Sequence, residues 1–232
     1  MGDLESNTVL KRITYLEKRE DLSQTDFGQH WVGPHAEIAR DLPGVACYLQ
    51  NHVQHRISLS DEPAYRVDGI VELWFQSDEV VSAASDSLVA DRLVEDELKF
   101  LSGLTGGPVI AHLPHEPWPY KIWVLGLRKP ETTSDALGQW EQKLCGSLPG
   151  VLGSEINLLK DNPVLLLREG LRHETQIPHV AVALGFEDQH SAENALDVIA
   201  ADQHKLLGLL RNVHVYLARE RVIVDAQVGA ES

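Results

Sequence analysis

Hydrophobic and polar positions divide the start of the chain into a strand and a helix. Residues 10–19 alternate with a period of two, which is typical of a strand whose two faces have different surroundings. Residues 26–42 instead carry apolar side chains at helical spacing, and these are Phe27, Trp31, Ile38 and Leu42. A Leu-Pro-Gly sequence at 42–44 then ends the predicted helix, because proline cannot continue it and glycine tolerates a left-handed backbone.

The same patterns predict four further elements in this half of the chain. Strands are expected over about 45–57, 67–75 and 108–113, and a helical region over about 78–101 that breaks near Asp86. The Gly-rich segment 102–107 between them is predicted to be a turn. The resulting order is strand, helix, strand, strand, helix, strand.

This order starts again in the second half, with a strand at 121–129 and a helix at 135–144. Gly28-Gln29 recurs 110 positions later, residues 42–45 recur 106 positions later, and Val71, Leu73 and Phe75 recur 111 positions later. The offset changes by four inside the helix, about one turn, so the apolar face keeps its direction. We interpret this as a tandem duplication.

The predicted boundary between the two repeats lies in the Pro-rich segment 112–120. Residues 1–117 then form the first repeat and residues 118–232 the second, which is lengthened by an irregular insertion around 160–176. The proline content of this segment is typical of a linker.

The polar residues of the first repeat are not kept in the second. His30 is replaced by Trp140, Asp68 by His179 and Glu72 by Ala183. His35 has no counterpart, since there is no histidine between Trp123 and Arg172. A residue that the fold itself required should persist in both copies, so we expect the first repeat to carry the functional site.

Composition and charge exclude several classes of protein. The chain has 232 residues, 43% of them hydrophobic, as expected of a soluble globular protein. Its net charge of -15 argues against nucleic acids and anionic membrane surfaces. No apolar run approaches the roughly 20 residues that span a bilayer. Cys47 and Cys145 are the only cysteines, which favours a reducing, cytoplasmic location.

The eleven histidines do not suggest a metal site. His30 and His35 are five positions apart, so one helix face does not present both of them as a spacing of four would. His52 and His55 are three apart on a strand and point to opposite faces. The glycines at 103–107 are not followed by the Lys-Ser/Thr of a phosphate-binding loop. We therefore expect neither a metal nor a cofactor.

A set of residues in the first repeat has the spacing of a known family. The set is Phe27, His30-Trp31, His35, Leu42-Pro43-Gly44, Tyr48, Asp68-Gly69, Glu72-Leu73-Trp74-Phe75, Asp96-Glu97 and Phe100. In these positions residues 10–113 resemble the EthD-type proteins of the dimeric α+β barrel superfamily, and residues 121–224 resemble them only as a scaffold. The resemblance implies an α+β fold: two tandem ferredoxin-like repeats (βαββαβ) whose antiparallel sheets form an α+β barrel.

The resemblance also implies a class of chemistry. Relatives include cofactor-independent lactone isomerases, polyketide cyclases and dehydratases, and quinone-forming monooxygenases. We expect a cofactor-independent lyase or isomerase that acts on a hydrophobic aromatic, lactone or polyketide-like molecule. One alternative is a cofactor-independent monooxygenase of activated phenols, and another is a non-catalytic module that binds a small molecule. A homodimer is also expected.

The matched residues receive roles on the same basis. His35 would be the general base or acid with His30 assisting, because histidine exchanges protons near neutral pH. Glu72 or Asp96 would orient the imidazole, and Tyr48 would hydrogen-bond a carbonyl or phenolate oxygen. The remaining candidates would bind substrate, and these are Trp31, Asp68, Trp74, Asp96 and Phe100.

Overall fold

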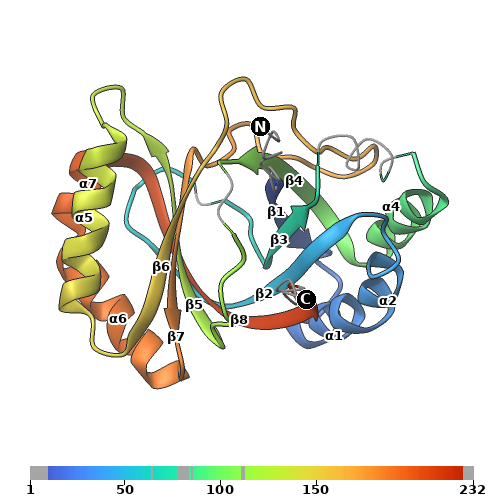
Figure 1. Cartoon of the computed structure of the whole chain (residues 1–232), viewed down its shortest axis with the longest axis horizontal. Coiled ribbons are helices and arrows are strands. Elements are labelled where there is room, and N and C mark those ends of the chain that lie inside the picture. Colours follow the sequence, from blue (N-terminus) through green and yellow to red (C-terminus); the bar gives the residue numbers. More distant parts are fainter. Residues whose placement is uncertain (1–9, 64, 78–83, 85, 111–112, 227–232) are drawn as a thin grey trace, which may run out of the picture.

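The computed structural model describes residues 10–63, 65–77, 84, 86–110 and 113–226, and one eight-stranded sheet runs through it (Figure 1). The strand order is β4-β1-β3-β2-β8-β5-β7-β6, and all neighbouring strands pair antiparallel. The strands are β1 (Leu10–Lys18), β2 (Val45–Ser58), β3 (Gly69–Phe75), β4 (Leu101–Val109), β5 (Tyr120–Arg128), β6 (Val151–Leu158), β7 (Val180–Phe186) and β8 (Leu210–Val224).

Two groups of helices lie on opposite flanks of this sheet (Figure 1). The first group is α1 (Gln24–His30), the π-helical turn η1 (Trp31–His35), α2 (Ala36–Ala39) and α4 (Leu88–Phe100). The second group is α5 (Ser134–Ser147), α6 (Gln189–Ala201) and α7 (Gln203–Leu209). In each half the strands follow the order fourth, first, third, second, which is that of a ferredoxin-like unit, so the predicted fold class is confirmed.

The two halves repeat each other in strand register. Leu10 on β1 lies opposite Phe75 on β3, and Tyr120 on β5 lies opposite Phe186 on β7 in the same way. The pairing of β2 with β3 and that of β6 with β7 each shift register just after the first residue of β2 or β6. The duplication therefore extends to the irregularities of the sheet, while the boundary at residue 117 stays a prediction.

Both Leu-Pro-Gly sequences lead from a helix into a strand. Gly44 has a φ of 71° and Gly150 a φ of 75°, in the left-handed region that side chains with a Cβ avoid. The helix end predicted at 42–44 is confirmed, whereas α5 continues to Ser147, three residues past its predicted end at 144.

The sheet closes on itself within one chain. One junction is the long pairing of β2 with β8, from Tyr48 opposite Val224 to Ser58 opposite His214. At the other edge, the segment after β6 pairs with β4 through three bridges: Val109–Leu159, Gly106–Leu166 and Gly103–Arg172. The insertion at 160–176 thus completes an α+β barrel.

The Gly-rich segment 102–107 was wrongly predicted as a turn, because it lies within β4. A Cβ on Gly106 would lie 2.6 Å from Thr14 Oγ1, and one on Gly107 would lie 2.7 Å from Leu159 Cδ1. These glycines therefore allow β4 to pack closely between β1 and the segment 159–172 that bridges to it.

The helix predicted over 78–101 is confirmed only in its second part. α4 begins at Leu88, where the Ser87 side chain accepts a hydrogen bond from the Ala90 backbone N–H. Residues 78–83 and 85 lie outside the described residues, so the first part of that prediction is untested. The predicted strand 108–113 ends at Val109, and residues 111–112 also lie outside them.

Among the described residues, three large hydrophobic clusters and a small one of Cys47, Leu49 and Trp74 fill the fold. One large cluster lies between the first group of helices and β1–β4, one inside the barrel, and one between α5–α7 and the second half of the sheet. Aromatic side chains include Phe27, Trp31 and Phe100 in the first large cluster, Trp118 and Trp123 in the second, and Trp140 in the third.

Candidate functional site

The helix of the first half changes its winding where His35 leaves it. The structure has a π-helical turn from Trp31 to His35, with Pro34 inside it. Proline has no N–H to donate and its ring crowds the carbonyl one turn earlier, so the helix widens at this point. The His35 side chain then enters the interior, where the residue is only 8% exposed.

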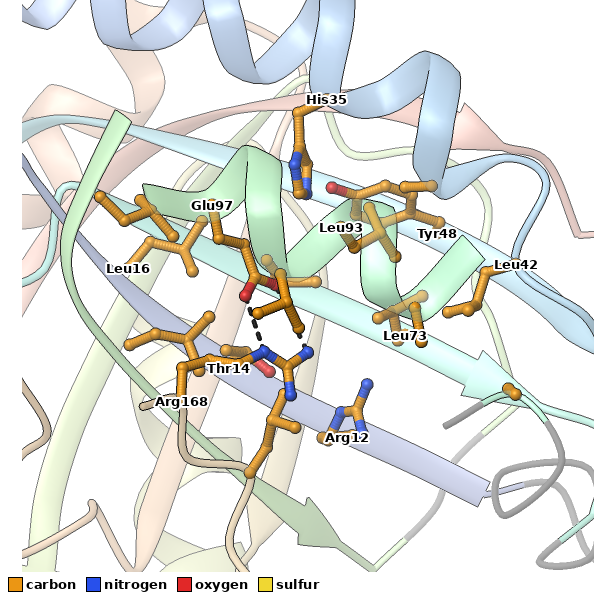
Figure 2. Close-up of a pocket in the computed structure, with 18 of the residues that line it drawn as sticks. Arg12, Thr14, Leu16, His35, Leu42, Tyr48, Leu73, Leu93, Glu97 and Arg168 are labelled. Carbon is orange, nitrogen blue, oxygen red and sulfur yellow. Dashed lines mark hydrogen bonds and ion pairs between the residues drawn. The ribbon is translucent and has the colours of Figure 1, made fainter. Parts of the chain in front are cut away.

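A cavity of about 140 Å³ lies between these helices and the sheet (Figure 2). The figure shows His35 descending from the helical layer toward side chains that rise from the strands. A cavity of about 150 Å³ is large enough for benzene, so this one suits a molecule with a single ring. Its polar lining consists of Arg12, Thr14, His35, Tyr48, Glu97, Arg168 and the exposed Asp91, and the other lining residues are apolar.

Asp96 on α4 joins the two candidate histidines. His35 Nδ1 lies 3.1 Å from Asp96 Oδ2, and His30 Nε2 lies 3.1 Å from both carboxylate oxygens. Lys99 Nζ donates to Oδ1 at 3.2 Å. Burial alone would raise the pKa of Asp96, but the hydrogen bonds from His35, His30 and Lys99 outweigh it and hold the pKa below its ordinary range. An ionised Asp96 therefore fixes the His35 ring and leaves its Nε2 as the nitrogen that can accept a proton.

The Tyr48 hydroxyl is held by a second network. It accepts hydrogen bonds from Trp31 Nε1 at 3.1 Å and from Gln50 Nε2 at 2.9 Å. Gln50 Oε1 in turn lies 3.0 Å from His52 Nε2. Burial raises the pKa of Tyr48, so the phenol stays protonated at neutral pH. The Tyr48 oxygen is the acceptor in both hydrogen bonds, so the hydroxyl can still donate its own proton to a ligand in the cavity.

Trp31 and Phe100, both predicted to bind substrate, lie behind the cavity wall. Phe100 is fully buried, with its ring centroid 4.8 Å from that of His30 and 5.0 Å from that of His35. Trp31 is also fully buried, and its ring packs 4.4 Å from His52. Both rings support the polar residues and do not line the cavity.

Glu72 and Trp74 point away from the cavity, which corrects their predicted roles. Successive side chains of a strand face opposite sides, and on β3 it is Leu73 and Phe75 that line the cavity. Glu72 lies inside the barrel, where it pairs with Lys11 and hydrogen-bonds to Lys121. The carboxylate that contacts His35 is Asp96.

Glu72 belongs to a buried ion-pair cluster between the halves. Lys11 Nζ lies 2.6 Å from Glu155, and Lys121 Nζ lies 2.6 Å from Glu220. Burial would raise the pKa of Glu72, but Lys11 and Lys121 outweigh it and lower the pKa. Ligand atoms of Glu72, His115 and Glu155 lie within 4.8 Å of one another, a spacing that a metal ion could bridge. Two ammonium groups already neutralise these carboxylates, so the arrangement fits ion pairing between the halves better.

Asp68 also has a structural role in place of the predicted substrate contact. Its Oδ2 accepts a hydrogen bond from the Lys18 backbone N–H at 2.9 Å. This bond ties the end of β1 to the start of β3, and Asp68 does not line the cavity.

Arg12, Arg168 and Glu97 line the cavity, although none of them was predicted to be a site residue. Arg168 Nε donates to Glu97 Oε2 at 2.7 Å. Arg12 shares its face of β1 with Thr14, so an arginine on an inward-facing position of a strand was a usable signal. Arg168 comes from the irregular insertion, where periodicity gives no information.

None of the helices that the structure describes has the length and apolar character that crossing a bilayer requires.

Several solved structures are similar to the whole chain. An anthrone oxidase-like protein is 10% identical, with 97% of this chain and 98% of that one covered and a TM-score of 0.61. A candidate monooxygenase from Lactobacillus acidophilus is 12% identical, with 93% and 95% covered and a TM-score of 0.54. A candidate chlorite dismutase is also 12% identical, with 94% and 95% covered and a TM-score of 0.51. At these identities the likeness shows the fold alone.

No curated protein matches the sequence. The family model of the EthD domain matches residues 19–103, which include His30, His35, Tyr48 and Asp96. The resemblance expected from these residues is confirmed for this part of the chain: residues 19–103 match the EthD domain.

Proposed function

We propose that the chain is a cofactor-independent enzyme, of lyase or isomerase type, that removes a proton from a small molecule at a cavity lying mainly in its first half. The observation that carries the proposal is the buried His35–Asp96 pair at the cavity wall. A carboxylate bound to one ring nitrogen fixes the tautomer and stabilises the imidazolium that forms when the other nitrogen takes a proton.

The first step is proton transfer to His35 Nε2 from a carbon beside a substrate carbonyl. The electron pair of the broken C–H bond moves to the carbonyl oxygen and forms an enolate. Tyr48 donates its hydroxyl proton in a hydrogen bond to that oxygen, and Asp96 stabilises the imidazolium. The cavity is mainly apolar, which strengthens both interactions.

The enolate then has two outcomes that need no further reactant. In an isomerase, the imidazolium returns the proton to a different carbon. In a dehydratase, the enolate oxygen re-forms the carbonyl, and the electron pair of the enolate double bond forms a new double bond to the neighbouring carbon. The hydroxyl group on that carbon takes the proton from His35 and leaves as water. Both outcomes restore neutral His35.

A second candidate is a monooxygenase of activated phenols, favoured by the fold shared with an anthrone oxidase-like protein and a candidate monooxygenase. His35 would again remove the first proton, here from the phenol. Dioxygen is then required: one of its atoms becomes the new quinone oxygen, and the other leaves as water with the phenolic hydrogen and the hydrogen of the ring carbon that is oxidised. Dependence on dioxygen distinguishes this candidate from the first.

The direct test is hydrogen exchange, which requires no knowledge of the natural substrate. Proton NMR in D₂O follows exchange of the acidic C–H in a panel of small cyclic diketones. We expect the wild-type protein to accelerate it, and His35→Ala and His35→Gln each to lower the rate about a hundredfold to ten-thousandfold.

Glutamine retains hydrogen bonding but cannot shuttle a proton, so the two variants should be similarly inactive. If His35→Gln keeps most of the exchange activity, His35 is not the base. If the wild-type protein exchanges none of the panel and turns over no phenol with or without dioxygen, the non-catalytic binding module is favoured.

The proposal also covers the class of substrate, the cellular location and the oligomeric state. The mainly apolar cavity supports a hydrophobic small-molecule substrate, and the two cysteines support the cytoplasm as its location. A homodimer of the full chain also remains a prediction, for which sedimentation analysis is the measurement.

A further inference from the structure

Arg12 on β1 is a cation at the cavity wall. Within the described part of the chain it makes no ion pair, and its Nε is buried without a hydrogen-bond partner. Its guanidinium carbon lies 5.3 Å from the centroid of the Phe75 ring. Arg168, the other arginine of the cavity, is paired with Glu97. An unpaired guanidinium beside an apolar cavity destabilises the folded protein, because it has lost water without gaining a partner. This suggests that a ligand supplies the missing acceptor.

The charges around Arg12 leave one positive charge uncompensated. Burial and the nearby Arg168 lower the pKa of Arg12 to about 10, and Glu97 offsets this only in part. Arg12 therefore remains protonated at neutral pH. Asp91 is the other carboxylate of the lining, and it lies on the exposed side of α4. The chain as a whole carries a net charge of -15, whereas this cavity carries a half-buried positive charge.

The Thr14 hydroxyl is a second polar group at this place that has no hydrogen-bond partner among the described residues. Thr14 lies two residues from Arg12 on the same face of β1, and its Oγ1 is buried. A hydroxyl next to a guanidinium can donate a hydrogen bond to the same anion.

We propose that Arg12, with Thr14 and the neighbouring Arg168, binds a carboxylate group of the substrate. The natural substrate is then a small cyclic or aromatic carboxylic acid, an assignment that rests on the proposed function of the same cavity. A guanidinium presents two parallel N–H donors that match the two oxygens of a carboxylate. The cavity volume of about 140 Å³ limits the remainder of the ligand to about one ring.

The positions of the two arginines indicate that this contact would orient the substrate. Figure 2 shows Arg12 and Arg168 on the sheet side of the cavity, and His35 on the helical side. A carboxylate held at Arg12 would direct the far side of the ring toward His35 and Tyr48. Binding energy at one end of the substrate would thus orient the carbon that loses its proton.

The test compares two ligands of nearly the same shape, benzoate and neutral benzamide, by titration calorimetry on the full chain. We expect benzoate to bind at least tenfold more tightly. Arg12→Gln should remove this preference, and Thr14→Val should reduce it. Arg92→Gln on the exposed side of α4 makes the same change in net charge and should leave the preference intact.

Two further measurements separate this proposal from the proposed function. His35→Gln should lose hydrogen exchange but keep the preference for benzoate, whereas Arg12→Gln should lose the preference. If circular dichroism shows that Arg12→Gln does not fold, Thr14→Val and Arg12→Lys take its place. Both should lower the affinity for benzoate more than the affinity for benzamide.

Three results would overturn the carboxylate site. One is equal binding of benzoate and benzamide by the wild-type protein, and another is an undiminished preference in the folded Arg12 and Thr14 variants. The third is acetate binding as tightly as benzoate, which would indicate an adventitious ion only.

Discussion

The two interfaces between helices and sheet share one backbone plan but differ in what fills them. In the second half, Leu137, Trp140 and Leu144 of α5 pack against β5 and β7 in a continuous apolar core. Trp140 occupies the position of His30, and Ile122 occupies that of Arg12. In the first half the corresponding space holds a cavity with polar groups.

This difference indicates how the fold supports a site. Cavities and buried polar groups reduce stability, and a well-packed core offsets them. Here the second half supplies that core, and the ion pairs between Lys11, Glu155, Lys121 and Glu72 join it to the first half. The first half can therefore retain an incompletely packed interface.

Exchanging the residues that distinguish the halves should have the largest effect. His30→Trp should lower hydrogen-exchange activity about 10–100-fold, because Asp96 loses a partner that holds it in place. Trp140→His should leave activity unchanged but reduce the free energy of unfolding by about 3 kcal/mol, since it leaves a gap in the core. NMR exchange rates and urea unfolding measure the two effects. Equal losses of activity would mean that α5 of the second half also supports catalysis.

Asp96→Asn should have a smaller effect, one that depends on pH. Because the folded pKa of Asp96 is lowered, its ionised form stabilises the protein above the unfolded value of about 3.9. That contribution is lost as pH falls through the folded pKa.

We therefore expect Asp96→Asn to cost about 1–3 kcal/mol at pH 7. The difference from the wild-type protein should shrink below about pH 4. Urea midpoints of both proteins at pH 7, 5 and 3 give the comparison, and a difference that grows as pH falls to 3 would contradict a lowered pKa.

The smallest expected effect concerns two equivalent glycines. A Cβ on Gly138 would meet nothing within 4 Å, so Gly138→Ala should raise the free energy of unfolding by about 0.5–1 kcal/mol through helix propensity. A Cβ on Gly28 would lie 3.3 Å from His52 Nδ1, next to the Tyr48 network. Gly28→Ala should therefore raise the free energy of unfolding by less. Equal gains in urea unfolding would show that His52 moves freely.

The fold was predictable because its information is periodic and present twice. Alternation identified the strands, and the recurring Leu-Pro-Gly sequences fixed the alignment of the repeats. The prediction failed at 102–107, where the glycines permit close packing of strands in place of a turn. A close approach by a distant segment leaves no local signal in the sequence.

The site was predictable only in part, for a related physical reason. His35 and Asp96 lie on helices, whose apolar stripes indicate which side faces inward. β3 is buried on both faces, so its pattern does not tell which of Glu72 and Leu73 faces the cavity. Arg168 lies in an insertion without periodicity, so only the folded chain shows its partner Glu97.

The pairing of β2 with β8 has a consequence for how the barrel forms. Where two chains build such a barrel, assembly depends on protein concentration. Here both partners belong to one chain, so closure is unimolecular and dilution does not open it. Moreover, a mutation in a homodimer alters both partners at once, whereas in this chain it alters one side. Covalent linkage thus frees each half to change independently, which is the condition under which His30 and Trp140 can occupy equivalent positions.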